Sequence, residues 1–171
     1  MNGLLVQELE QDREHLLDLT LMAGRRGLKK KITHSQVQKM GLAMTGFIKF
    51  INPERLQIIG NTEMAYLRTL SAEQQEKVIH EICSLDLSCL IITRNLQVPD
   101  FLLQEADARG IPLFRTALRS FDFIERVTQY LEEKLASTTT IHGVLMDVFG
   151  VGVLILGKSG IGKSECALDL I

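Results

Sequence analysis

Apolar residues form short unbroken runs in the middle of the chain, separated by stretches in which apolar and polar positions recur with a helical period. Leu56–Ile59 is predicted to be a strand, and the continuous run Cys89–Thr93 is typical of a strand buried on both faces of a parallel sheet. Ile111–Phe114 predicts a further strand with a proline near its start. This alternation of strands and helices is typical of a doubly wound α/β fold.

The stretches between these runs carry helix start and stop signals. A Gly60-Asn61 turn precedes a predicted helix over 62–70, and Ser71 with Gln74 three residues later forms a capping box for the next helix. The apolar face of that second helix is predicted to contain Val78, Ile79, Ile82 and Cys83.

Two further helices are predicted before the runs end. Pro99 is placed to open one helix and Gly110 to close it. A longer amphipathic helix then follows, with core positions predicted at Phe121, Ile124, Val127, Leu131 and Leu135. Residues 4–19 indicate a short amphipathic helix and then a strand. Residues 1–135 are therefore expected to form a three-layer α/β domain with a mainly parallel sheet.

Composition adds few constraints on function. The 171 residues are 46% hydrophobic and 23% charged, with a net charge of −2, which favours neither a nucleic acid nor a membrane surface as partner. The early acidic residues do not suit a signal peptide, and no apolar run is long enough for a membrane span, so a cytoplasmic protein is expected. The three cysteines, at 83, 89 and 166, are expected to be buried free thiols.

A basic run stands out against this balance. Gly24–Lys31 holds five cations in eight residues, which suits an anionic effector or nucleic acid as well as a solvated loop. Because no aromatic residues lie nearby to stack on bases, the solvated loop is the favoured interpretation.

The pattern changes after Ser137–Thr140, which is the predicted join to a second domain over 136–171. Ile141–Phe149 is strand-like, and Gly150-Val151-Gly152 is predicted to turn it back onto a buried strand over Val153–Leu156. His142 would then lie near whatever follows that second strand. A lone histidine on a strand is more often a structural hydrogen-bonding group than a catalytic one, so both roles stay open.

A glycine-rich sequence follows this strand: Gly157-Lys158-Ser159-Gly160-Ile161-Gly162-Lys163-Ser164. It fits the phosphate-binding loop pattern, in which glycines let backbone N–H groups face a polyphosphate, the lysine reaches the terminal phosphates and the serine hydroxyl holds Mg²⁺. A helix is predicted to open at Ser164, which supplies the strand–loop–helix setting that the motif requires. An ordinary glycine-rich turn is the alternative.

The segment from Thr138 to Ile155, running on into Gly160-Ile161-Gly162-Lys163-Ser164-Glu165, closely resembles the bifunctional HPr kinase/phosphorylase family. Pro53–Glu63 and Ile91–Arg94 in the first domain agree with it. The resemblance implies an enzyme that uses ATP and Mg²⁺ to phosphorylate a serine of HPr, the phosphocarrier of the sugar phosphotransferase system. It also implies the reverse reaction with inorganic phosphate, which releases pyrophosphate, a role in carbon regulation and a hexameric assembly.

Carried over by match, the family's catalytic histidine falls on His142 and its loop lysine on Lys163. Residues 157–164 would hold the ATP phosphates, with Ser164 on the metal. The family's acid/base aspartate, its second metal carboxylate and its HPr-contacting loop would lie beyond Ile171. A chain of this extent is therefore expected to be a truncated P-loop kinase without activity of its own.

Two other functions remain open from the sequence. A phosphate loop on a hairpin-fed strand also suits a small-molecule kinase. A folded first domain with an incomplete site could instead be an effector-binding or assembly module without catalysis. Nucleotide titration separates these functions.

Overall fold

A computed structural model describes residues 3–12, 14–137 and 140–170. By its internal contacts the chain divides into two compact units, Met1–Ala136 and Ser137–Ile171.

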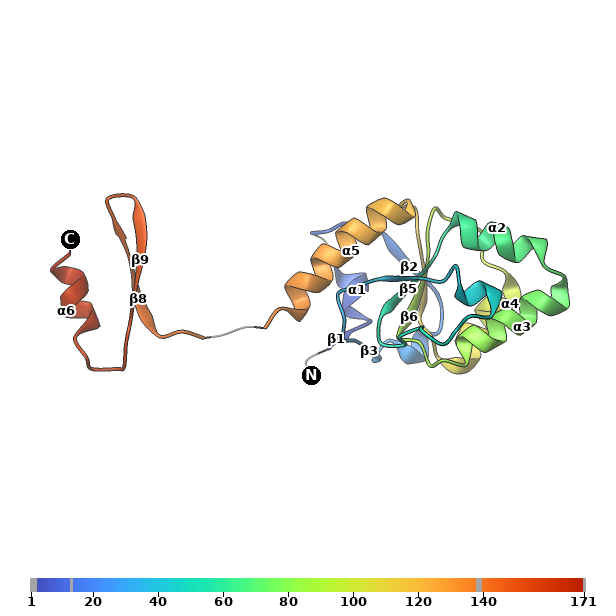
Figure 1. Cartoon of the computed structure of the whole chain (residues 1–171), viewed down its shortest axis with the longest axis horizontal. Coiled ribbons are helices and arrows are strands. Elements are labelled where there is room, and N and C mark those ends of the chain that lie inside the picture. The colour runs from blue at the N-terminus through green and yellow to red at the C-terminus, as the bar shows by residue number, and fades with distance from the viewer. Residues whose placement is uncertain (1–2, 13, 138–139, 171) are drawn as a thin grey trace. The chain divides into compact units, whose positions relative to one another are not determined.

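The larger unit is built on a five-stranded sheet in the order β2-β7-β6-β5-β4 (Figure 1). Strands β4 to β7 run parallel to one another, and β2 closes one edge antiparallel to β7. A second, two-stranded antiparallel sheet joins β1 to β3. The strands are β1 (Leu4–Leu5), β2 (Leu19–Ala23), β3 (Lys31–Ile32), β4 (Gln38–Lys39), β5 (Leu56–Ile59), β6 (Cys89–Ile92) and β7 (Leu113–Thr116).

Helices cover both faces of the large sheet, so the unit has three layers (Figure 1). One face carries α2 (Asn61–Thr69), α3 (Ala72–Cys83) and α4 (Asp100–Arg109), and the other carries α1 (Glu8–Gln11) and α5 (Ser120–Leu135). Successive residues of β6 enter opposite cores, because side chains alternate across a strand. The predicted three-layer α/β domain with a mainly parallel sheet is confirmed.

The helix signals act as expected. The Ser71 hydroxyl accepts a hydrogen bond from Gln74 N (3.3 Å), and the Gln74 side chain accepts one from Ser71 N (3.0 Å) at the start of α3. Pro99 caps α4, and Gly110 ends it in the left-handed conformation with φ of 60°. Three of the four residues predicted for the apolar face of α3 are buried, and Val78 is partly buried.

Two predictions in this unit were wrong in detail. The strand expected over 111–114 lies instead at Leu113–Thr116, because that is the segment with which β6 and β2 both pair. Phe121 is 75% exposed rather than buried, and Phe123 lies in the core instead. Since α5 begins at Ser120, Phe123 shares with Val127 the face that meets the sheet, and Phe121 does not.

The basic run forms the 3₁₀ turn η1 (Arg25–Gly27) and leads into β3. Most of its cations are exposed, as expected of a solvated loop, and Lys30 forms an ion pair with Asp86 (2.7 Å). The backbone of the turn is nonetheless fixed, because an added Cβ on Gly27 would lie only 1.9 Å from the carbonyl oxygen of Gly110. The predicted short helix is α1, whereas the strand β2 begins only at Leu19, where the predicted range 4–19 ends.

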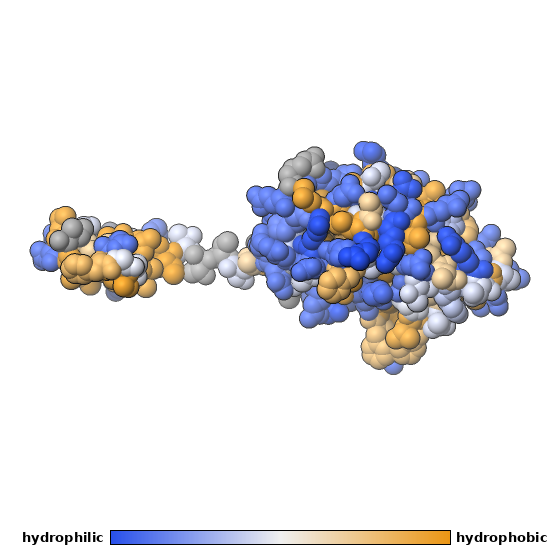
Figure 2. All heavy atoms as spheres, turned by 90° about the horizontal axis from the view of Figure 1, so that it is seen from above, coloured by the Kyte–Doolittle hydropathy of each residue, from blue (hydrophilic) through white to orange (hydrophobic). Residues whose placement is uncertain are grey.

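The smaller unit is a hairpin of β8 (Gly143–Val148) and β9 (Val151–Leu156) followed by α6 (Lys163–Leu168). The turn consists of Phe149 and Gly150, both at positive φ, rather than the predicted Gly150-Val151-Gly152, whose last two residues pair within the ladder. The prediction of a buried strand over Val153–Leu156 was wrong for this chain, since Leu154 and Leu156 are about half exposed (48% and 56%). Apolar surface is accordingly widespread on this unit (Figure 2).

All three cysteines are free. Cys83 and Cys89 are buried as expected, and burial raises the pKa of each thiol to about 12. Cys166 is exposed, which contradicts the prediction, because α6 has only a two-stranded hairpin to pack against. No helix within the described part of the chain is long and apolar enough to cross a membrane.

Candidate functional site

The predicted phosphate loop, Gly157–Ser164, connects β9 to α6 in a strand–loop–helix arrangement. Gly160 and Gly162 have φ of 79° and 91°, in the left-handed region that glycine adopts without a steric penalty. Gly162 is also the N-cap of α6, so the helix begins one residue before the predicted start at Ser164. The loop therefore has the backbone conformation that its glycines predict.

Lys163 folds back over the loop that precedes it. Its Nζ atom donates hydrogen bonds to the carbonyl oxygens of Gly157 (2.9 Å) and Lys158 (2.7 Å). The aliphatic part of the same side chain lies close to Gly157, where an added Cβ would be 3.6 Å from Lys163 Cδ. The ammonium group is thus held at the mouth of the loop, where an anion bound to the loop would meet it.

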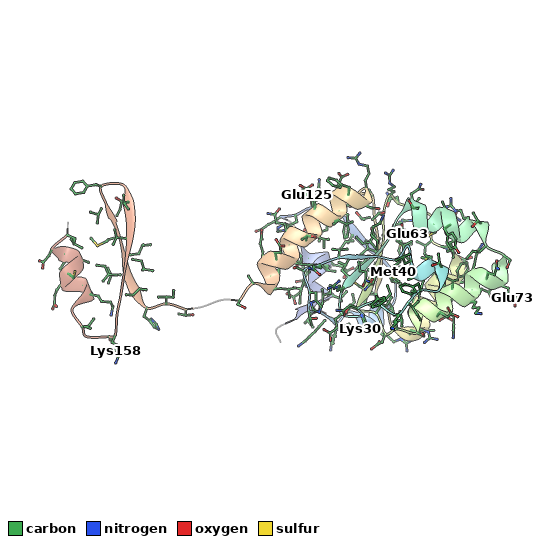
Figure 3. All side chains as sticks on the ribbon, in the orientation of Figure 1. Lys30, Met40, Glu63, Glu73, Glu125 and Lys158 are labelled. Atoms are coloured by element: carbon green, nitrogen blue, oxygen red, sulfur yellow. The ribbon has the colours of Figure 1, made fainter. Side chains whose placement is uncertain are left out.

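Lys158 differs from Lys163 although both belong to the loop. Its side chain is exposed and extends away from the ribbon (Figure 3), and no side-chain hydrogen bond is found for it among the described residues. The ammonium group of Lys163 is therefore held by hydrogen bonds, whereas that of Lys158 is solvated.

The hairpin register sets the position of His142. The outermost pair of the ladder is Gly143 with Leu156, so His142 and Gly157 are the first residues beyond the paired strands at the same end. His142 is exposed. The fold of the hairpin therefore carries His142 back to the end at which the loop begins, about fifteen residues after it in sequence.

The carboxylates of the smaller unit lie either at the turn of the hairpin, opposite the loop 157–164, or along α6 and its C-cap. Asp147 is at the opposite end of the hairpin, where its Oδ1 accepts a hydrogen bond from Gly150 N in the turn (2.8 Å). Glu165 was not predicted as a site residue, yet its Oε2 approaches Gly162, since an added Cβ there would be 2.8 Å away. Glu165 is the third residue after the N-cap Gly162, which is the position of the acidic residue in a capping box, and this spacing could have identified it from the sequence. Glu165 follows Ser164 directly in the first turn of α6, and Asp169 is the C-cap of that helix.

These features define the class of protein: an α/β unit followed by a strand, a glycine-rich loop whose sequence fits the phosphate-loop pattern, and a helix. Residues 4–131 match the family model described as HPr Serine kinase N terminus, and residues 133–171 match that of the HPr Serine kinase C-terminal domain. The chain belongs to the HPr kinase/phosphorylase family.

Relatives named HPr kinase/phosphorylase align along most of the chain. The protein of Geobacter sulfurreducens is 52% identical over 169 residues, covering 99% of this chain and 53% of the relative. That of Bacillus mycoides is 44% identical over 153 residues, covering 90% of this chain and 50% of the relative. The chain therefore spans about half the length of the curated relatives it matches.

The fold also resembles a solved structure of low sequence identity. It is the crystal structure of the CBS and DRTGG domains of the regulatory region of Clostridium perfringens pyrophosphatase, complexed with the activator diadenosine tetraphosphate. The match has a TM-score of 0.50 and 16% identity, and covers 74% of this chain and 50% of that chain. At this identity the likeness concerns the fold alone.

Proposed function

We propose that this chain is the front part of a bifunctional enzyme that phosphorylates a serine of HPr with ATP and reverses the reaction with inorganic phosphate. The observation that carries the proposal is the loop Gly157–Ser164, with its left-handed glycines and with Lys163 Nζ at its mouth. The names of the relatives support the same reaction partners, since they are called HPr kinase/phosphorylase.

The residues of the loop take separate roles in this proposal. Backbone N–H groups of 157–164 bind the ATP phosphates, and the Lys163 ammonium neutralises the charge that develops during transfer. The Ser164 hydroxyl would hold Mg²⁺, which would neutralise part of the phosphate charge.

His142 is the proposed catalytic residue outside the loop. An imidazole at the loop end of the hairpin can orient an incoming phosphate or the reacting hydroxyl, and it can be neutral or cationic near neutral pH. In the reverse direction inorganic phosphate is the nucleophile, the phosphoryl group leaves the serine of HPr, and pyrophosphate is the second product.

The chain by itself is proposed to be inactive. Phosphoryl transfer of this kind needs a carboxylate for the metal and a group that activates the acceptor hydroxyl. Asp147 lies at the far end of the hairpin, Glu165 is on the helix that carries Ser164, and Asp169 is the C-cap of that helix. Regulation of carbon use and a hexameric assembly in the cytoplasm belong to the same proposal for the complete protein.

Nucleotide titration of the chain tests the proposal. Weak ATP binding that depends on Lys163 and is improved by Mg²⁺ is expected, without phosphate transfer to HPr. Absence of any Lys163-dependent nucleotide or phosphate binding would contradict the assignment of the loop. Transfer of phosphate to HPr by the isolated chain would contradict the proposed inactivity.

A further inference from the structure

A histidine and three carboxylates gather where α1 and the loop after it meet the last turns of α5, far in sequence from the phosphate loop. Figure 1 shows α1 beneath α5, and the Tyr130 hydroxyl of α5 donates a hydrogen bond to the carbonyl oxygen of Glu8 on α1 (3.0 Å). His15 lies between the two elements, with its ring edge-on to Tyr130 at 5.3 Å between ring centres. Its side chain is only 9% exposed.

The two nitrogens of His15 have different surroundings. Nδ1 lies 3.0 Å from Oδ1 of Asp12, whose side chain is 2% exposed and which also accepts hydrogen bonds from the backbone N–H groups of His15 and Leu17. Nε2 points toward Glu133, 3.4 Å from its Oε2. A ligand atom of Glu14 joins them, so that His15, Glu14 and Glu133 each place one donor atom within 4.8 Å of the others.

If the imidazole is neutral and its Nδ1–H group donates a hydrogen bond to Asp12, the Nε2 lone pair faces the carboxylates of Glu14 and Glu133. Two lone-pair groups repel unless a positive charge lies between them, and that charge is either a proton on Nε2 or a metal cation. A carboxylate that fixes the tautomer of a histidine through Nδ1 is the usual outer-shell partner of a metal-bound imidazole. Asp12 is in that position.

The distance between His15 and Glu133 agrees with the separation of two ligand atoms on a zinc ion. Bonds of about 2.1 Å at a tetrahedral angle separate two ligand atoms of zinc by about 3.4 Å. His15 Nε2 and Glu133 Oε2 have this separation already. Glu133 is half exposed and Glu14 is exposed, so both side chains can adjust, and water can fill a fourth position.

We propose that Glu14, His15 and Glu133 form a binding site for a first-row divalent cation, Zn²⁺ in the first place, with Asp12 as the group that orients His15. One imidazole nitrogen and two carboxylate oxygens form a ligand set that suits zinc, while hard cations such as Mg²⁺ prefer oxygen ligands alone. The site is structural: it fastens the last turns of α5 to the loop after α1. It does not depend on the proposed kinase function.

The competing explanation is an ion pair, in which a protonated His15 bridges Asp12 and Glu133 without any metal. A substitution of Glu14 distinguishes the metal site from the ion pair, because the ion pairs found for His15 involve Asp12 and Glu133 and not Glu14. Removing the Glu14 charge therefore weakens a metal site but leaves the ion pairs intact. Glu132, exposed on α5 beside Glu133, provides a matched control with the same charge change.

The experiment uses the whole chain, stripped of metal, as wild type and as the variants Glu14→Gln, Glu133→Gln and Glu132→Gln. Zn²⁺ is titrated calorimetrically at about pH 8, because the hydrogen bond to Asp12 raises the pKa of His15 and an alkaline solution reduces the competition between the proton and the metal for Nε2. Wild type and Glu132→Gln are expected to bind one equivalent at this site, while Glu14→Gln and Glu133→Gln lose at least about tenfold in affinity. Zn²⁺ is also expected to raise the thermal midpoint of wild type but not of Glu14→Gln.

The metal-free thermal midpoint of Glu14→Gln shows whether the variant is folded, and it is expected to equal that of wild type because the side chain is exposed. Zinc affinity unchanged by Glu14→Gln, or no zinc bound by wild type, would overturn the proposal in favour of the ion pair. Co²⁺ absorption provides a second readout, since its visible bands report a nitrogen and oxygen ligand set of low coordination number.

Discussion

The Nζ atom of Lys163 lies 2.9 Å from the carbonyl oxygen of Gly157, so the ammonium group is hydrogen-bonded to the backbone of its own glycine-rich loop, 157–164. A bound phosphate offers a charged acceptor, which forms a stronger hydrogen bond with an ammonium group than a carbonyl oxygen does. Nucleotide binding is therefore expected to exchange the bonds to Gly157 and Lys158 for bonds to phosphate.

Lys163→Ala is expected to lower the affinity of the chain for ATP by at least about tenfold, because a charge-assisted hydrogen bond contributes on the order of 1.5–3 kcal/mol. Lys158→Ala is the matched control, since it removes an exposed cation from the same loop, and it is expected to change affinity little. Titration with a fluorescent ATP analogue measures both. Equal losses in the two variants would show that only the general charge of the loop matters. In the complete enzyme, Lys163→Ala should abolish both reaction directions.

His142→Ala in the complete enzyme is expected to impair the phosphate-dependent reverse reaction at least as strongly as the kinase reaction. The reason is that the free phosphate nucleophile must be held and oriented, and the hairpin register brings His142 to the loop end. Steady-state rates in both directions are the measurement, with ATP affinity and thermal melting as controls. Unchanged rates would reduce His142 to a structural residue, as would a collapse of the melting temperature.

Cys166 is expected to be the one cysteine that a thiol reagent labels rapidly in the folded chain. Cys83 and Cys89 are buried, and burial raises the pKa of each to about 12, so almost no thiolate is present near neutral pH. Counting released chromophore against time measures this. Cys166→Ser should remove the rapid phase, and a rapid phase that persists in that variant would show that the larger unit opens readily.

Gly27→Ala is expected to destabilise the larger unit by about 3 kcal/mol, because the new methyl group would lie 1.9 Å from the carbonyl oxygen of Gly110 and both groups belong to fixed backbone. Gly46→Ala is the comparison, since that glycine has φ of 88° but open space around it, and a cost of about 1 kcal/mol is expected. Urea denaturation measures both. A smaller loss for Gly27→Ala than for Gly46→Ala would contradict the close approach.

Glu105 is expected to add to the pH dependence of stability. The hydrogen bond from Arg109 (2.9 Å), with a second from His80, holds the pKa of this carboxyl below its ordinary value of 4.5. A lowered folded-state pKa means that the stabilisation is fully present above the unfolded value and is lost as the pH falls through the folded value. Stability should therefore fall on acidification below about pH 4.5.

Glu105→Gln is expected to flatten this fall, because its side chain cannot take up the proton. Glu76→Gln, an exposed position on the neighbouring helix α3, is the control and should keep the wild-type slope. Urea midpoints across the acidic range compare the three proteins. Identical slopes for all three would show that solvent screens the Arg109 interaction completely.

Local signals predicted the parts of the fold that depend on neighbours in sequence. The strand Cys89–Ile92 follows from its unbroken apolar run and Leu56–Ile59 from its mainly apolar one, and both ends of α4 follow from Pro99 and Gly110. The backbone conformation of Gly157–Ser164 follows in the same way, since its positions of positive φ are glycines of the segment itself. A hairpin was also predicted, although its turn lies at Phe149 and Gly150.

The errors concern contacts between distant segments. The segment that becomes β7 is decided by its pairing with β2, and Phe123 rather than Phe121 is buried because of where α5 meets the sheet. The cluster around His15 was missed for the same reason, since Glu133 comes from a helix more than a hundred residues later. No spacing rule connects such residues before the fold is known.

The antiparallel edge strand β2 has a consequence for the order in which the sheet assembles. Leu19 pairs with Thr116, about a hundred positions further along the chain, whereas β5, β6 and β7 follow one another. At a translation rate of roughly 5–20 residues per second, β2 leaves the ribosome on the order of ten seconds before its partner. Its apolar residues Leu19 and Leu21 stay without their sheet for that interval, so a nascent chain of this protein should be a substrate for ribosome-associated chaperones until β7 emerges.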